Sequence, residues 1–151
     1  MNVVIEITNN KLVEEGKIEI VERKGLGHPD YIADSIAENF SRNLSKYYIE
    51  NFGTILHHNV DKLEIVGGKV NVKFGGGNFE KPIIIFFSGR ATSEIIEKGR
   101  KIKIPIKKIA KESAIEFIKN NYRFFNPEDK NQIRFVVETK GGSTDLVRLF
   151  K

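Results

Sequence analysis

The sequence contains no cysteine and no tryptophan, and it has only one methionine and three histidines in 151 residues. Without cysteine the chain can form no disulfide, use no thiol as a nucleophile and bind no metal through sulfur. Three histidines are also too few for most zinc sites. No apolar run approaches the length that a membrane-spanning helix needs, and the first residues lack the basic and apolar regions of a signal peptide. We therefore expect a cytoplasmic protein with no membrane partner.

The chain also lacks internal repeats, low-complexity tracts and any linker rich in proline or serine. Its length fits one domain, so we expect residues 1–151 to form a single α+β domain that includes, at most, the start of a second domain near the C-terminus. The net charge of +5 favours an anionic partner, such as a nucleotide, a polyphosphate or nucleic acid. A lysine-rich sequence without any such partner would have the same charge.

Apolar periodicity predicts secondary structure along most of the chain. Spacings of three and four residues predict helices at residues 30–51 and 105–121, and Pro29 and Gly53 are suited to begin and end the first helix. Extended patterns predict strands at residues 17–23, 54–58, 62–66, 69–74, 82–88 and 132–138. We expect residues 67–68, both glycine, to form a tight hairpin turn and residues 89–100 to be irregular or only briefly ordered.

The apolar run PIIIFFS at residues 82–88 is the best candidate for a buried central strand. Two helices alternating with short strands favour an α+β fold, with one mixed or antiparallel sheet covered by helices on one face. The other face of that sheet would be left open and apolar, so we expect it to be an interface.

Three segments carry polar residues that secondary structure alone does not require. The first is KGLGHPD at residues 24–30, where two glycines precede a helix N-terminus that offers free N–H groups to a phosphate. There, His28 could donate a hydrogen bond to a developing oxyanion, and Asp30 is a hard oxygen ligand suited to Mg²⁺. The alternative is an ordinary glycine turn in which His28 caps the helix and Asp30 interacts with its dipole.

The second segment contains His57 and His58, whose side chains would point to opposite faces of a regular strand. Each is a candidate ligand-binding residue or a turn residue in contact with solvent. The third is KGGSTD at residues 140–145, where backbone N–H groups, two hydroxyls and Lys140 could surround a polyphosphate. Its glycine spacing differs from that of a Walker A motif, so a plain connection between elements is the alternative. Arg90 follows the central strand, where ligands often bind, although a solvated arginine is the commoner outcome.

Six blocks of the sequence, taken in order, resemble the archaeal-type S-adenosylmethionine synthetases, which are methionine adenosyltransferases. The blocks extend over almost the whole chain, at residues 22–34, 52–62, 66–68, 74–77, 88–92 and 142–147. One such block would carry little weight. Six blocks in the family's order make the chain similar to this family along nearly all of its length.

The resemblance implies a subunit or fragment of an enzyme that forms S-adenosylmethionine from ATP and methionine and releases phosphate and pyrophosphate. By position in the matching blocks, His28 would be the catalytic residue that hydrogen-bonds the bridging oxygen, Asp30 would bind Mg²⁺, and His58 would line the substrate site. The matching ATP-binding loop comprises Lys140, Gly141, Gly142, Ser143, Thr144 and Asp145. The cofactors that the resemblance implies are Mg²⁺ and K⁺.

Two departures from the family pattern are visible. Lys140 stands where the family's loop usually has its first glycine, so a non-catalytic nucleotide-binding or regulatory subunit is the alternative function. Family members are also more than twice as long, and they are dimers with active sites between subunits. We therefore expect at most one ligand half-site here, and either a homo-oligomer or a second chain that carries the missing domains. A nucleic-acid partner is not expected, because only the pI of about 9.3 favours it.

Overall fold

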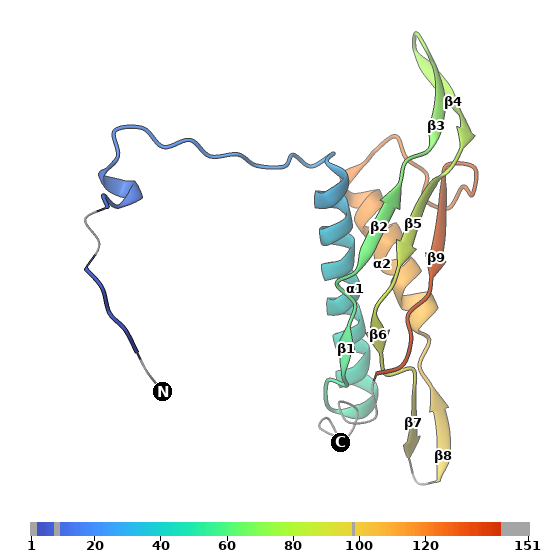
Figure 1. The fold of residues 1–151 in the computed structure, drawn as a ribbon. Coiled ribbons are helices and arrows are strands. Elements are labelled where there is room, and N and C mark those ends of the chain that lie inside the picture. The colour runs from blue at the N-terminus through green and yellow to red at the C-terminus, as the bar shows by residue number, and fades with distance from the viewer. Residues whose placement is uncertain (1–2, 8–9, 98, 143–151) are drawn as a thin grey trace.

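The computed structural model describes residues 3–7, 10–97 and 99–142, and it has two long helices packed beside short strands (Figure 1). The helices are α1 (Pro29–Phe52) and α2 (Ile106–Asn121), and the 3₁₀ turn η1 covers Val13–Glu15. The strands are β1 (His58–Asn59), β2 (Leu63–Val66), β3 (Lys69–Lys73), β4 (Gly76–Lys81), β5 (Ile83–Phe87), β6 (Arg90–Ala91), β7 (Glu94–Glu97), β8 (Arg100–Lys103) and β9 (Ile133–Val137). The expected α+β class is confirmed. In the described ranges, however, the strands form one three-stranded sheet and three separate pairs, β1-β6, β3-β4 and β7-β8, in place of the single sheet expected. No helix in the described ranges is long and apolar enough to cross a membrane.

Helix α1 begins and ends close to where the sequence predicts, and local signals set both ends. Pro29 occupies the first helical position, where its missing N–H costs nothing. At the other end Gly53 has a φ of 73°, in the left-handed region that glycine adopts without strain. The buried stripe of α1 consists of Ala33, Ile36, Ala37, Phe40, Leu44 and Tyr48.

A three-stranded mixed sheet with the strand order β2-β5-β9 forms the centre of the fold. Strand β5 pairs antiparallel with β2 and parallel with β9, so the apolar run at residues 82–88 is the central strand that the sequence predicts. Alternate residues of β5 and β9 enter one core with α1 and α2; these are Ile85, Phe87, Ile133 and Val137. The Phe40 and Phe87 rings meet edge to face, with 5.8 Å between their centroids, and so join α1 to the central strand.

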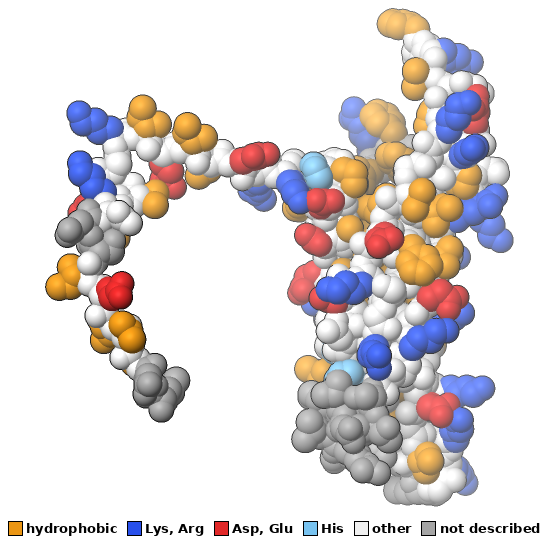
Figure 2. Space-filling view, viewed as in Figure 1, with side chains coloured by type: hydrophobic (Ala, Val, Ile, Leu, Met, Phe, Trp, Pro, Cys, Tyr) orange, Lys and Arg blue, Asp and Glu red, His pale blue; other side chains and the backbone are white. Residues whose placement is uncertain are grey.

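The other side of this sheet, here called the open face, carries the remaining alternate residues. It consists of Glu64, Val66, Ile84, Phe86, Arg134 and Val136. Val66 and Val136 are 54% and 36% exposed, and Figure 2 shows apolar side chains between charged ones on this side of the molecule. In Figure 1 α2 lies behind the sheet and α1 stands beside β2. The core residues of β5 and β9 pack with both helices, so the open face is the side that does not belong to this core.

Residues 17–23 do not form the strand that the sequence predicts. Ile18 and Ile20 are 82% and 91% exposed, because the segment before α1 runs away from the body and pairs with no described strand (Figure 1). Backbone N–H and C=O groups need partners for a strand to be stable. An alternating apolar pattern therefore does not form a strand when no neighbouring strand is there to pair with it.

One further prediction is wrong. The turn predicted at residues 67–68 does not pair β2 with β3, because β3 pairs with β4 around Gly75, whose φ is 79°. A Cβ at Gly68 would come 3.0 Å from the Ile83 nitrogen, so this glycine permits a close approach of two backbones and makes no hairpin turn. Residues 89–100, expected to be irregular or only briefly ordered, contain the short strands β6 and β7 and the start of β8. Pairing between short strands satisfies their backbone groups without a long apolar pattern.

Replacing Phe40 by alanine should lower the free energy of unfolding by about 3–5 kcal/mol. Phe40 is fully buried at the contact between α1 and β5, and the smaller side chain would leave a cavity there. Urea denaturation followed by circular dichroism measures the change. Phe74→Ala is the matched control, because Phe74 is fully exposed and its loss should change the free energy of unfolding by less than about 0.5 kcal/mol. Equal effects of the two substitutions would contradict the assignment of the core.

Candidate functional site

His28 lies at the N-terminus of α1, where the glycine turn at residues 24–27 leads into the helix. The backbone N–H of Asp30 donates to Nδ1 of His28 over 3.1 Å. Because Nδ1 accepts this bond, the proton of the neutral imidazole is on Nε2, and the residue is exposed. His28 is therefore the helix cap and also an available hydrogen-bond donor, so the two roles considered from the sequence are compatible.

Asp30 is exposed in the first turn of α1 and forms an ion pair with Lys24. The hydrogen bond and the charge of Lys24 lower the pKa of Asp30 below its ordinary value of 3.8. The carboxylate is therefore ionised at neutral pH, as a metal ligand must be. The described residues contain no cluster of three or more acidic or histidine side chains that could hold a metal. Mg²⁺ can bind through one or two protein carboxylates when phosphates and waters complete its shell. Asp30 as a Mg²⁺ ligand therefore stays a prediction, and its carboxylate contacts Lys24 in this structure.

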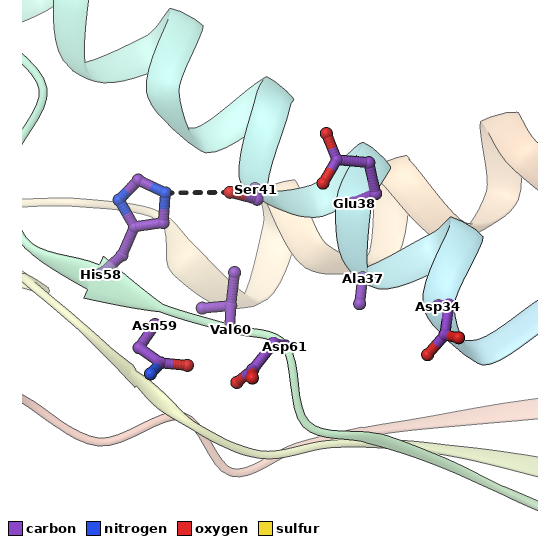
Figure 3. A pocket seen from close by; sticks show the side chains of 8 residues that line it. All are labelled: Asp34, Ala37, Glu38, Ser41, His58, Asn59, Val60 and Asp61. Atoms are coloured by element: carbon purple, nitrogen blue, oxygen red, sulfur yellow. Dashed lines mark hydrogen bonds between the residues drawn. The ribbon is translucent and has the colours of Figure 1, made fainter. Parts of the chain in front are cut away.

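His58 lies in a polar cleft between α1 and β1 (Figure 3). Its Nδ1–H donates to the Leu56 carbonyl over 2.9 Å, so Nε2 is an acceptor in the neutral imidazole. The hydroxyl of Ser41 lies 3.1 Å from Nε2, and that of Ser45 lies 3.4 Å from it. Both ring nitrogens therefore have partners within the chain, and His58 joins β1 to α1.

Carboxylates line much of the same cleft. Asp34 and Glu38 reach it from α1, and Asp61 reaches it from the segment after β1 (Figure 3). Lys62 lies 2.7 Å from the Asp61 carboxylate and offsets one negative charge. Because like charges repel strongly near a protein surface, this cleft favours a cationic group over a triphosphate.

The backbone of Lys140 pairs with β6, and β6 pairs in turn with β1, the strand that contains His58. Its N–H donates to the Gly89 carbonyl over 3.0 Å, and its carbonyl accepts from the Ala91 N–H over 2.8 Å, so Lys140 pairs in parallel with Arg90. On its other edge β6 pairs with β1, and Arg90 lies opposite Asn59. Lys140 thus pairs as a strand residue does, and its place in the loop does not call for a glycine conformation.

The structure brings His58 and Lys140 to one end of the sheet and leaves His28 and Asp30 at the other (Figure 1). The Ser41 contact of His58 lies 13 residues along α1 from His28, which corresponds to about 20 Å at 1.5 Å per residue. The described part of a single chain therefore does not place the two groups of candidate residues in one site. Gly141 and Gly142 follow Lys140 directly, whereas Ser143, Thr144 and Asp145 lie outside the described residues.

Polar contacts that the sequence does not predict hold this end of the fold together. Tyr48 is fully buried, its hydroxyl donates to the Thr92 carbonyl over 2.8 Å, and burial raises its pKa. The N–H and the hydroxyl of Thr92 both donate to the His57 carbonyl, each over 3.0 Å. Tyr48 lies on the apolar stripe of α1, which indicates burial, but nothing in the local sequence identifies a partner 44 residues away.

Replacing Lys24 by methionine should raise the pKa of Asp30 toward 3.8, because the ion pair is the largest cause of its depression. An Asp30 carboxylate with a lowered pKa stabilises the folded chain above pH 3.8, and this contribution is lost as the pH falls through the folded pKa. Carbon-detected NMR titration of the Asp30 carboxyl group measures the shift. Lys17→Met, on the same exposed segment, is the matched control. An Asp30 titration that is the same in both variants would contradict the ion pair.

Comparison with known proteins identifies the family. The sequence model described as S-adenosylmethionine synthetase (AdoMet synthetase) matches residues 1–151. The chain is 51% identical over 150 residues to an S-adenosylmethionine synthase of Caldivirga maquilingensis, a match that covers 99% of this chain and 36% of the relative. S-adenosylmethionine synthases of Pyrobaculum neutrophilum and Hyperthermus butylicus are each 47% identical, over 98% and 99% of this chain. In both, the match again covers 36% of the relative. The chain spans about a third of the length of these relatives, and it belongs to the S-adenosylmethionine synthetase family.

Proposed function

We propose that the chain is part of a methionine adenosyltransferase, which forms S-adenosylmethionine from ATP and methionine. The observation that carries this proposal is the pair of His28 and Asp30 at the N-terminus of α1, in a chain of this family. One residue offers a hydrogen-bond donor and the other an ionised carboxylate, beside the positive end of a helix dipole. The donor and the helix end are suited to a leaving group that becomes strongly anionic, whereas the carboxylate would contribute only through a bound cation.

In this reaction the methionine sulfur attacks the 5′ carbon of ATP, and the bond from that carbon to the triphosphate oxygen breaks. Nε2–H of His28 would donate to that oxygen as negative charge develops on it. Asp30 would hold Mg²⁺, which supplies positive charge against the triphosphate when bound, and K⁺ is a second cation that the family implies. Hydrolysis of the released triphosphate then gives phosphate and pyrophosphate.

The ATP-binding loop is proposed to comprise Lys140, Gly141, Gly142, Ser143, Thr144 and Asp145. About 20 Å of helix α1 separates this end of the sheet from His28. A complete site therefore requires a second chain, or another part of a longer one, that brings a loop of this kind close to the α1 N-terminus. A homo-oligomer is the simplest such assembly.

For His58 we retain the proposal of a substrate-lining residue. The acidic side chains around it favour the ammonium group of methionine over the phosphates of ATP. Because both ring nitrogens of His58 already have partners, its contribution would be to shape the cleft and to position β1. A cytoplasmic location also remains a proposal, as expected from the sequence.

The alternative, a non-catalytic nucleotide-binding subunit, is not favoured. Its motivation was Lys140 at a position where the family usually has glycine. Lys140 pairs with Arg90 through both its N–H and its carbonyl, so this lysine does not indicate a distorted or abandoned loop.

Replacing His28 by asparagine separates catalysis from capping. Asparagine is a good N-cap, so α1 should remain stable, whereas loss of the imidazole should lower the rate of S-adenosylmethionine formation by about 10²–10³-fold. The assay contains the chain with any co-purifying partner, ATP, methionine, Mg²⁺ and K⁺, and detects the product by mass spectrometry. His28→Ala, which removes both roles, should lose activity and also some helix stability. Full activity in the asparagine variant would show that His28 is only a cap.

We expect the purified chain to associate through the open face, because exposed apolar side chains there would otherwise contact water. Light scattering at micromolar concentration should give a mass well above the 17.2 kDa of one chain. Phe86→Glu places a charge on the open face and should shift the chain toward the monomer. Phe74→Glu, at the exposed turn between β3 and β4, is the matched control. A stable monomer that binds no partner would rule out the proposed assembly.

A further inference from the structure

We propose that Arg90 is a further anion-binding residue, which acts with Lys140 to bind a phosphate or carboxylate group of a substrate beside Gly141 and Gly142. The inference rests on the proposed function, in which the loop that begins at Lys140 binds ATP. Phosphate and carboxylate are bound by the same chemistry, and the two substrates supply one each: the triphosphate of ATP and the carboxylate of methionine.

Strand register places the two cations side by side. Arg90 lies opposite Asn59 on β1 and opposite Lys140 on its other edge. Paired residues on neighbouring strands share a face of the sheet, so these three side chains form one row. The next pair along, His58 and Ala91, turns toward the core, where Ala91 is only 1% exposed. Figure 3 shows Asn59 pointing away from the helix that His58 meets, so the row lies on the side of the sheet opposite α1.

The backbone fixes the place from which Arg90 emerges. Gly89 has a φ of 115°, and a Cβ on it would collide with the backbone of Asn59 and Val60. This close approach holds β6 against β1, while the two hydrogen bonds between Lys140 and its neighbours hold the other edge. Arg90 is thus anchored on both sides, and its position does not depend on a flexible loop.

One of the two positive charges of the row is compensated within the described residues, and the other is not. Arg90 is exposed and forms no ion pair with a side chain in the described part of the chain. The Lys140 side chain is 78% exposed, and its ammonium lies 3.2 Å from the Glu138 carboxylate, which offsets one of the two positive charges. A guanidinium binds phosphate or carboxylate through two parallel hydrogen bonds, whereas an ammonium acts as a point charge. Arg90 is therefore suited to orient the anion and Lys140 to attract it.

The test measures binding of two separate probes, inorganic tripolyphosphate and methionine, to the folded chain by NMR titration. Arg90→Met should weaken binding of one probe by about tenfold, the size expected for loss of a charge-assisted hydrogen bond. Arg90→Lys should bind the probe more tightly than Arg90→Met but less tightly than the unmodified chain, because lysine keeps the charge and loses the two parallel hydrogen bonds of the guanidinium. Arg134→Met is the matched control, since Arg134 is an exposed arginine of β9, on the open face of the central sheet and six residues before Lys140.

Weaker binding of tripolyphosphate alone supports the proposal and assigns Arg90 to ATP, and weaker binding of methionine alone supports it and assigns Arg90 to the amino acid. Equal effects of Arg90→Met and Arg134→Met, or no change with either probe, would overturn it. The outcome is separate from that of the proposed function, which is decided by product formation and by His28→Asn. If the unmodified chain forms product and Arg90→Met binds both probes normally, only the role of Arg90 is disproved and the proposed function stands.

Discussion

Helix α1 is the constraint on which the rest of the structure depends. Its 24 residues form a rod about 36 Å long, and its apolar stripe packs against the sheet along most of that length. One end presents His28 and Asp30, and His58 meets the helix more than three turns further on. Because a packed helix cannot shorten, the two groups of candidate residues stay apart in each chain. The chemistry proposed for the family must therefore be assembled from more than one copy or segment.

The elements predicted well from the sequence are those whose signals are local. Helix α1 has Pro29 at one end and Gly53 at the other, and the central strand β5 has an uninterrupted apolar run. The failures concern pairing, which depends on distant residues. Residues 17–23 alternate like a strand but have no neighbouring strand in the described chain. Gly68 looks like a turn residue, yet it allows two backbones to approach each other.

The candidate site divides in the same way. The positions of His28 and Asp30 follow from the helix start that the sequence marks, including the cap and the dipole. Lys24 as the partner of Asp30 could not be predicted, because it depends on the path of the glycine turn between them. The pairing of Arg90 with Lys140 requires β9 to run parallel to β5. The apolar pattern within β5 or β9 does not predict that the two strands pair in parallel, because this arrangement depends on how the intervening helix α2 packs.

The parallel pairing of β5 with β9 also has a consequence for the order of folding. Ile83 pairs with Ile133, so the central strand needs a partner about 50 residues later in the chain. Closing so long a loop lowers the entropy of the chain before any stabilising contact forms. The antiparallel partner β2 is much closer along the chain. During synthesis, α1, β2 and β5 can therefore meet first, and their exposed apolar edge persists until α2 and β9 have left the ribosome.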